Sequence, residues 1–275
     1  MSEHVQGQAG EAEGVAAQGL RSRRFQPLVV CYHAVSDSWP NMLAVTPQAF
    51  ELQLRSLLRR GYRPATASET LPGVGRLLHV TFDDAYRSVA KAVPILERLG
   101  VHATVFVCTA YADTGRPLDV PEIAGDLDGY ADELATMDWD MLRAVADHGV
   151  EIGSHTVSHP HLTRLSDAEL VHELRDSRER IEAELPGACR FLAYPYGEED
   201  GRVRAAAQTA GYDAAFSLVS RERPFDPHAL PRVELHGGDS LLRATLKTSF
   251  VRRPGRILLK VTRTAHTVTA VGTSS

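Results

Sequence analysis

The stretch Leu77-Leu78-His79-Val80-Thr81-Phe82-Asp83-Asp84 decides how the rest of this 275-residue sequence is interpreted. Residues 77–82 form a short apolar run typical of a buried strand, and two adjacent carboxylates follow it directly. Successive side chains of a strand point to opposite faces, so Asp83 and Asp84 reach one pocket only if the strand ends there. Because Asp also favours helix N-caps, the pair by itself is equally consistent with the start of a helix.

Strand-like and helical patterns alternate on both sides of this stretch, and the helical patterns end at Gly61, Gly100 and Gly149. This alternation predicts a parallel sheet with helices outside it, open or closed, and the chain length fits one (β/α) barrel of about 250 residues. A further helix is expected at Ser166, where Glu169 completes a capping-box pattern. The acidic residues 111–137 are expected to form an insertion or a long loop. The expected strands are residues 27–33, 77–82, 103–109, 151–155, 191–194, 214–219 and 230–235.

The composition divides the chain into three parts. Residues 1–24 lack periodicity and are predicted to be a disordered N-terminal tail, whereas residues 25–240 form the single folded domain. Residues 241–275 form a basic C-terminal extension, in which Arg243 and later Lys and Arg residues meet almost no acidic ones. This extension is a candidate for peripheral contact with a membrane or an anionic glycan, although charge runs are more often solvated termini.

The overall charge and the cysteines bear on partners and compartment. A formal net charge of −5 argues against nucleic-acid binding, which needs a basic surface. The three cysteines are far apart in apolar runs, so we expect them to be buried and unpaired. The N-terminus lacks the pattern of a signal peptide, and no apolar run approaches the length of a transmembrane span. We therefore predict a cytoplasmic location.

Two more clusters follow predicted strands, where α/β folds collect their active-site residues. His155 and His159 are spaced i, i+4 and converge if the residues between them make a helical turn. Imidazoles are common ligands of zinc and other first-row metals. The aromatic turn Tyr194-Pro195-Tyr196 is either a substrate-binding wall or simply the turn that ends a strand.

These clusters supply one carboxylate and two imidazoles for a metal and leave a second carboxylate to accept a proton, which favours metal-assisted hydrolysis. Other hydrolase signatures, H-E-x-x-H and G-x-S-x-G, are absent from the sequence.

The T-F-D-D segment at 81–84 and the H-[ST]-x-x-H segment at 155–159 resemble the motifs of the polysaccharide deacetylases of carbohydrate esterase family 4, the NodB-homology domain. The resemblance covers residues 28–235, and the A-Y-P-Y-G turn is similar to the branch that includes poly-N-acetylglucosamine deacetylases. It implies an α/β fold, a distorted (β/α)7-type barrel. It also implies a metal-dependent hydrolase that removes N-acetyl groups from an N-acetylglucosamine-type sugar or polysaccharide.

The same resemblance assigns roles to individual residues. Asp83 is expected to be the catalytic base, and Asp84, His155 and His159 are expected to bind a divalent metal. Zinc is the expected metal, with Co²⁺, Ni²⁺ and Mn²⁺ as alternatives. Tyr194, Pro195 and Tyr196 are the expected substrate-binding residues.

The sequence departs from the family pattern in two places. The arginine that orients the base is missing, because Ala193 fills its place and Arg190 comes too early; we predict that Arg232 takes that role. His236 is a candidate general acid, with His33 as the other polar group near the site mouth.

The Asp-Trp pair of the family's fourth motif is not recognisable. Two alternatives therefore stay open: a metal-dependent amidase acting on a small non-sugar amide, and a catalytically silent carbohydrate-binding protein of the same fold.

Overall fold

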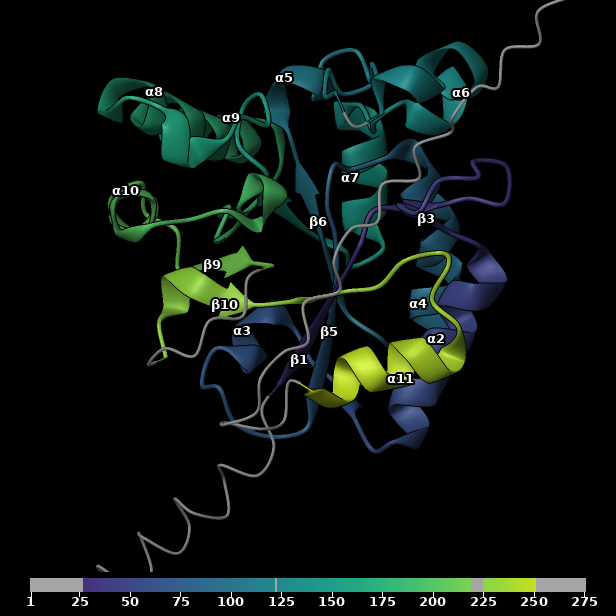
Figure 1. Cartoon of the computed structure of the whole chain (residues 1–275). Helices are drawn as coiled ribbons and strands as arrows, with labels where there is room; N and C mark the ends of the chain where they lie inside the picture. Colours follow the sequence, from purple (N-terminus) through teal and green to yellow (C-terminus); the bar gives the residue numbers. More distant parts are fainter. Residues whose placement is uncertain (1–26, 122, 219–224, 251–275) are drawn as a thin grey trace, which may run out of the picture.

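The structure of the protein, a computed structural model, describes residues 27–121, 123–218 and 225–250. Its centre is a sheet of short parallel strands surrounded by helices (Figure 1). Neighbouring strands follow the order β10-β9-β8-β7-β6-β5-β1-β11, and β4 pairs with β5 beside this path. The strands of this sheet are β1 (Leu28–Tyr32), β4 (Arg63–Pro64), β5 (Leu77–Phe82), β6 (Ala103–Val107), β7 (Glu151–Ser154), β8 (Phe191–Ala193), β9 (Ala214–Ser217), β10 (Leu230–Pro231) and β11 (Val233–Glu234).

One short segment, residues 230–235, joins the two edges of the sheet. β10 pairs with β9, whereas β11 pairs with β1 on the opposite edge. Between them the N–H of Arg232 donates to Ser217 O, and the N–H of Leu235 donates to Cys31 O, both at 2.9 Å. The sheet is therefore nearly closed into a barrel, and Arg232 lies at the closing point. This arrangement confirms the predicted single-domain (β/α) barrel.

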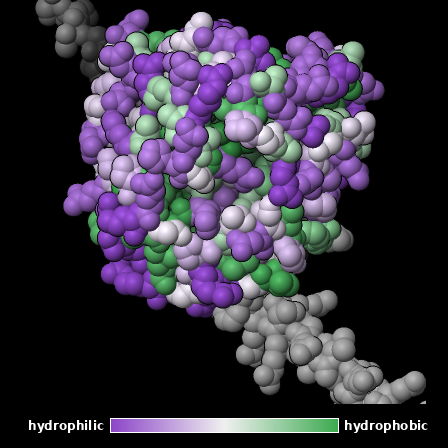
Figure 2. Space-filling model, turned by 180° about the vertical axis from the view of Figure 1, so that it is seen from behind, coloured by the Kyte–Doolittle hydropathy of each residue, from purple (hydrophilic) through white to green (hydrophobic). Residues whose placement is uncertain are grey.

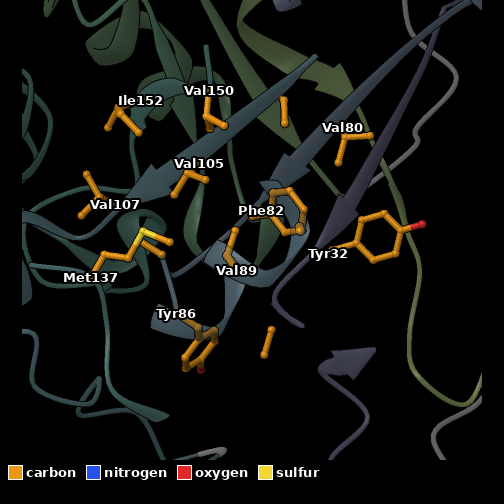
Figure 3. Close-up of a cluster of buried hydrophobic side chains, with 14 of the residues drawn as sticks. Tyr32, Val80, Phe82, Tyr86, Val89, Val105, Val107, Met137, Val150 and Ile152 are labelled. Carbon is orange, nitrogen blue, oxygen red and sulfur yellow. The ribbon is translucent and has the colours of Figure 1, made fainter. Parts of the chain in front are cut away.

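The two faces of each barrel strand serve two separate apolar layers, as the alternation of strand side chains requires. Val105 and Val107 of β6 face the helices together with Val80 and Phe82 of β5 (Figure 3). Phe106, between the two valines, belongs instead to the inner cluster of the barrel. Burial of one such side chain stabilises the fold by roughly 1.5–3 kcal/mol. The two layers together fix the positions of the strand ends.

The helices surround the barrel, and most begin at an N-cap that the sequence supplies. Ser166 Oγ accepts from the N–H of Glu169, and the Glu169 carboxylate accepts from the N–H of Ser166, which confirms the predicted capping box. The α-helices are α2 (Pro47–Arg59), α3 (Ala67–Thr70), α4 (Val93–Leu99), α5 (Thr109–Ala112), α6 (Leu127–Leu134), α7 (Trp139–Asp147), α8 (Asp167–Val171), α9 (Ser177–Glu184), α10 (Gly201–Thr209) and α11 (Leu241–Phe250). The 3-10 and π turns are η1 (Arg87–Ala92), η2 (Ala124–Asp126), η3 (Leu162–Arg164), η4 (His172–Asp176), η5 (Pro195–Gly197) and η6 (Pro227–Ala229). β2 (Ala34–Val35) and β3 (Ala44–Val45) pair outside the barrel.

Two predicted segments differ from the structure. The helix expected after Asp84 starts as the 3-10 turn η1, and α4 begins only at Val93, because Pro94 lacks the N–H that a continuous α-helix needs. Residues 111–137 are not one loop, since they contain η2 and α6. α6 is kinked at Tyr130, and its buried Leu134 holds it to the core.

The C-terminal helix α11 packs against α2 (Figure 1). Arg243 and Lys247 both pair with the buried Asp239, at 3.0 and 2.6 Å. These two residues of the basic extension thus share one carboxylate within the fold, and the described residues give no support to the predicted membrane contact. Residues 1–24, the predicted tail, and residues 251–275 of the extension lie outside the described residues.

One face of the molecule is mainly hydrophilic (Figure 2). Seen from the side opposite to Figure 1, polar residues cover most of the face, with hydrophobic ones scattered between them (Figure 2). Among the described helices, none has the length and apolar character that crossing a membrane requires. The three cysteines are buried and unpaired, as predicted.

Candidate active site

Three loops at the carboxyl ends of β5, β7 and β8 carry the two aspartates, the two candidate metal-binding histidines and the aromatic turn that the sequence singled out. These loops contain all the described non-glycine residues with positive φ: Asp84, Ala85, Thr156, His159 and Tyr196, at 49° to 74°. Such backbone conformations cost free energy, and they persist at sites where the surrounding structure fixes them for function.

Asp83 and Asp84 diverge in their contacts because β5 ends at Phe82. The N–H of Asp83 still donates to Tyr32 O at 2.9 Å, as in a strand. Asp84 then turns into the left-handed region with φ 67°. The strand therefore ends directly before the two aspartates, which is what allows both carboxylates to reach one pocket. Each carboxylate has its own set of partners.

Asp83 is held by Arg232 from the segment that closes the barrel. The two guanidinium NH groups donate to Oδ1 at 2.6 Å and to Oδ2 at 2.8 Å, and one of them also donates to Thr81 Oγ1 at 3.0 Å. The Arg232 side chain is buried and lies over the Phe106 ring, 5.5 Å from its centroid. Cys31 Sγ lies 3.4 Å from Asp83 Oδ2. This bidentate contact is what an orienting role for Arg232 requires. Arg190 instead forms an exposed pair with Asp213.

Asp84, His155 and His159 converge on one point. Nε2 of each imidazole lies 3.5 Å from Asp84 Oδ1, and one ligand atom from each of the three residues lies within 4.8 Å of the others. Two tetrahedral zinc ligands at bond lengths near 2.0–2.1 Å are about 3.4 Å apart. The spacing of these atoms therefore fits a single small cation.

The donor atoms also have the chemistry that a cation needs. His155 Nδ1 lies 2.8 Å from Ala193 O, so Nδ1 carries the proton and the Nε2 lone pair faces Asp84. Asp84 Oδ1 is buried and accepts no hydrogen bond within the described part of the chain. A buried carboxylate oxygen without a donor is unfavourable unless a cation satisfies it. The three residues thus fit a divalent metal.

The pKa values follow from burial and neighbouring charge. Burial alone raises the pKa of Asp83, but the Arg232 guanidinium and His155 outweigh it and hold the pKa well below its usual 3.8. For Asp84 burial prevails against the attraction of His33 and His155, and its pKa is raised. Burial lowers the pKa of His155 to about 4. At neutral pH, Asp83 is therefore ionised and His155 is a neutral imidazole, the form that binds metals.

The route by which the two histidines converge differs from the expected one. Residues 155–159 form no helical turn; the chain bends at Thr156 (φ 74°) and again at His159 (φ 65°). The two rings meet edge to face with centroids 4.9 Å apart. The i, i+4 spacing therefore brings the rings together through a loop that has two left-handed residues.

The Tyr194-Pro195-Tyr196 turn flanks the histidines. Tyr194 is fully buried, and its hydroxyl donates to His228 O at 2.9 Å, so its ring supports the turn from behind. Pro195 is also buried. Tyr196 packs edge to face on His159, with centroids 4.6 Å apart, and stacks on His161 at 4.0 Å. Of the three expected substrate residues, Tyr196 is the one that lies against the candidate metal site.

His33 and His236 lie on either side of Glu234. His236 Nε2 is 3.1 Å from one Glu234 oxygen, and His33 Nδ1 is 3.9 Å from the other. A ring nitrogen of His33 also lies within 4.8 Å of Asp83 and Cys31. In the region that the structure describes, no hydrogen bond or ion pair links His236 with Asp83 or Asp84. His33, which the sequence analysis named as the other polar group near the site mouth, is thus closer to the site than His236.

Comparison with known proteins agrees with this geometry. The sequence pattern of the polysaccharide deacetylases matches residues 72–215, and the chain belongs to the polysaccharide deacetylase family, hydrolases of carbohydrate amides. Its sequence is 26% identical over 223 residues to YxkH of Bacillus subtilis, a protein assigned to the polysaccharide deacetylases; the match covers 77% of this chain and 72% of YxkH.

Two solved structures share the fold. The deacetylase PplD of Streptococcus pyogenes superposes with a TM-score of 0.67 at 21% identity, over 84% of this chain and 100% of PplD. IcaB of Ammonifex degensii superposes with a TM-score of 0.65 at 24% identity, over 82% of this chain and 97% of IcaB. The family match confirms the family resemblance, and these two structures confirm the barrel fold.

Proposed function

We propose that this protein is a metal-dependent deacetylase that hydrolyses the N-acetyl group of an N-acetylglucosamine-type sugar or polysaccharide. The observation that carries the proposal is the convergence of Asp84, His155 and His159 beside the Asp83–Arg232 pair. Family membership supports a carbohydrate amide as the substrate.

The reaction adds water to the acetyl carbonyl and breaks the carbon–nitrogen bond, giving acetate and a free amine. Asp84, His155 and His159 would hold a divalent ion, which would supply Lewis acidity toward the carbonyl and the attacking water. Asp83 accepts the proton of that water, since Arg232 keeps its carboxylate ionised and fixed in direction. Tyr196 forms a wall of the site beside His159.

The leaving amine needs a proton, and we assign its delivery to His33 in preference to His236. His33 lies within 4.8 Å of Asp83, and its Nδ1 faces the Glu234 carboxylate at 3.9 Å. His236 contacts Glu234 and Lys247 instead. His236 is therefore placed to hold the Glu234 carboxylate in position, and it is less well placed to contact the substrate.

Acetate release from N-acetylglucosamine oligomers tests the proposal, with small ureides and imides as alternative substrates. The wild type should release acetate from the oligomers, and Asp83→Asn should be slower by about 10²–10⁴-fold, the usual contribution of a general base. Turnover of the small amides alone would favour the amidase alternative. Normal activity of Asp83→Asn would contradict the assigned mechanism.

The silent carbohydrate-binding alternative predicts a different result. Such a protein would bind the oligomers in a titration without releasing acetate, even after incubation with Zn²⁺. The complete set of Asp83, Asp84, His155 and His159 argues against it, because a binding protein has no need of a buried carboxylate that lacks a hydrogen-bond donor.

A further inference from the structure

The loop of residues 155–159, which carries both candidate metal-binding histidines, is fixed at each of its backbone N–H groups. Three of these groups bond within the loop or to the adjacent strand: His155 N–H to Val107 O, Thr156 N–H to Ser154 Oγ and His159 N–H to Thr156 Oγ1, at 2.8–3.1 Å. The two central groups, those of Val157 and Ser158, have no such local acceptor. Both donate to the side chain of Glu173, which lies on the helical segment that follows the loop.

Glu173 gives its whole carboxylate to this loop. Its Oε2 accepts from the N–H of Val157 at 2.8 Å and of Ser158 at 2.9 Å, and its Oε1 accepts from the Ser158 hydroxyl at 2.6 Å. The residue is buried, with 7% of its surface exposed. In the part of the chain that the structure describes, no Lys or Arg pairs with it. Charge-assisted hydrogen bonds of this kind are about twice as strong as neutral ones. The buried carboxylate is thus satisfied by the loop itself.

The helix that carries Glu173 departs from α-helical geometry at this residue. Between α8 and α9, residues His172–Asp176 form a π-turn, η4, and π-turns are rare and concentrate at functional sites. Carbonyls of the turn are bonded by hydroxyl groups: Ser177 Oγ donates to Glu173 O at 2.7 Å, and the Tyr212 hydroxyl donates to Leu174 O at 2.8 Å. Glu173 and Leu174 are both buried, so the turn directs a charged and an apolar side chain inward together.

A second contact joins this helix to the same loop. Ser177 Oγ lies 2.8 Å from Ser154 Oγ, which accepts the N–H of Thr156. Thr156 is one of the two left-handed residues that bring the histidine rings together. The π-turn helix therefore supports the loop at its first bend through Ser177 and at its centre through Glu173.

We propose that Glu173 is a positioning residue: it holds the loop of residues 155–159 in the conformation that presents His155 and His159 to the metal. This inference rests on the metal centre proposed above. Without the carboxylate, the Val157 and Ser158 N–H groups lose their acceptor, and the loop loses the contact that fixes its strained backbone. Some residues do not bind the metal themselves but orient the residues that do. Replacing one of them typically lowers the metal affinity by about 10–100-fold.

The test is the Zn²⁺ affinity of metal-free protein, measured by competition with a chromogenic chelator. Glu173→Ala should weaken Zn²⁺ binding by about 10–100-fold. Glu173→Gln keeps an acceptor oxygen for the two N–H groups and should recover part of the affinity. This variant also serves if Glu173→Ala does not fold. Glu169→Gln is the matched control, because Glu169 caps the same helix, is exposed and touches no residue of the loop. It should leave Zn²⁺ affinity unchanged and shift the melting temperature only slightly, because Gln at this position also completes a capping box.

Unchanged Zn²⁺ affinity in both Glu173 variants would overturn the positioning role, and so would an equal loss of affinity in Glu169→Gln. Wild-type protein that binds no Zn²⁺ would contradict the metal centre itself, and this inference with it. The three results are distinguishable in one set of titrations.

Discussion

The guanidinium of Arg232 meets the carboxylate of Asp83 through two hydrogen bonds of 2.6 and 2.8 Å, at the point where the barrel closes. The two residues are 149 positions apart in the sequence. Arg232 lies between β10, which pairs with β9, and β11, which pairs with β1. The segment that completes the barrel therefore also supplies the counterion of the proposed base.

Replacing Arg232 by Met should make the protein less stable near neutral pH, by an amount that shrinks in acid. Loss of one partner leaves the other charge buried and unpaired, which costs about 3–5 kcal/mol at pH 7. Arg232 holds the pKa of Asp83 below its unfolded value of about 3.8, so the pair contributes stability that is present above that value and is lost as the pH falls through the folded pKa. The variant lacks this contribution, so urea unfolding at several pH values should show a stability deficit that is largest near neutral pH and shrinks as the pH falls below 3.8.

Arg190→Met is the control for this experiment. Arg190 also pairs with an aspartate, Asp213 at 2.6 Å, but both side chains are about half exposed. Exposed pairs contribute 0–1 kcal/mol, so this variant should stay close to the wild type. Equal losses in the two arginine variants would contradict the special role of the buried pair.

The choice of proton donor can be tested by replacing each histidine in turn. His33→Gln should lower kcat by about 10²–10⁴-fold, because it removes the group assigned to protonate the leaving amine. His236→Gln should lower kcat by less than about tenfold, since it loses only a neighbour of Glu234. Acetate release and metal content should be measured for both. A severe loss in His236→Gln together with a mild one in His33→Gln would reverse the assignment.

Gly153 should tolerate no side chain, although its φ is ordinary. A Cβ there would lie 2.5 Å from the Phe106 ring, whose face also supports Arg232. Gly153→Ala should therefore destabilise the fold by about 1–3 kcal/mol in urea unfolding. Gly129→Ala, where nothing lies within 4 Å, should be neutral or stabilising by up to about 1 kcal/mol. A neutral Gly153→Ala would show that Phe106 can move freely.

The sequence predicts the barrel and the proximity of Asp84, His155 and His159 well because both depend on local patterns. Apolar runs that end in Asp83-Asp84 and in His155 mark the carboxyl ends of parallel strands, which topology brings to one edge. Other features depend on contacts far apart in the chain. The left-handed bend at Thr156 and the π-turn around Glu173 have no local signature, because hydrogen bonds from other elements stabilise them. The nearness of His33 to Asp83 likewise appears only when β1 pairs with β5.

Metal content measured together with acetate release tests the central claim most directly. Protein purified and reconstituted with Zn²⁺ should contain about one ion per chain and release acetate from N-acetylglucosamine oligomers. Chelation should abolish release while leaving cooperative unfolding, since the apolar core needs no metal to form, and added Zn²⁺ should restore it. His155→Ala should lose both the ion and the activity. Full acetate release from metal-free protein, or a wild type that binds Zn²⁺ no better than His155→Ala, would contradict the account.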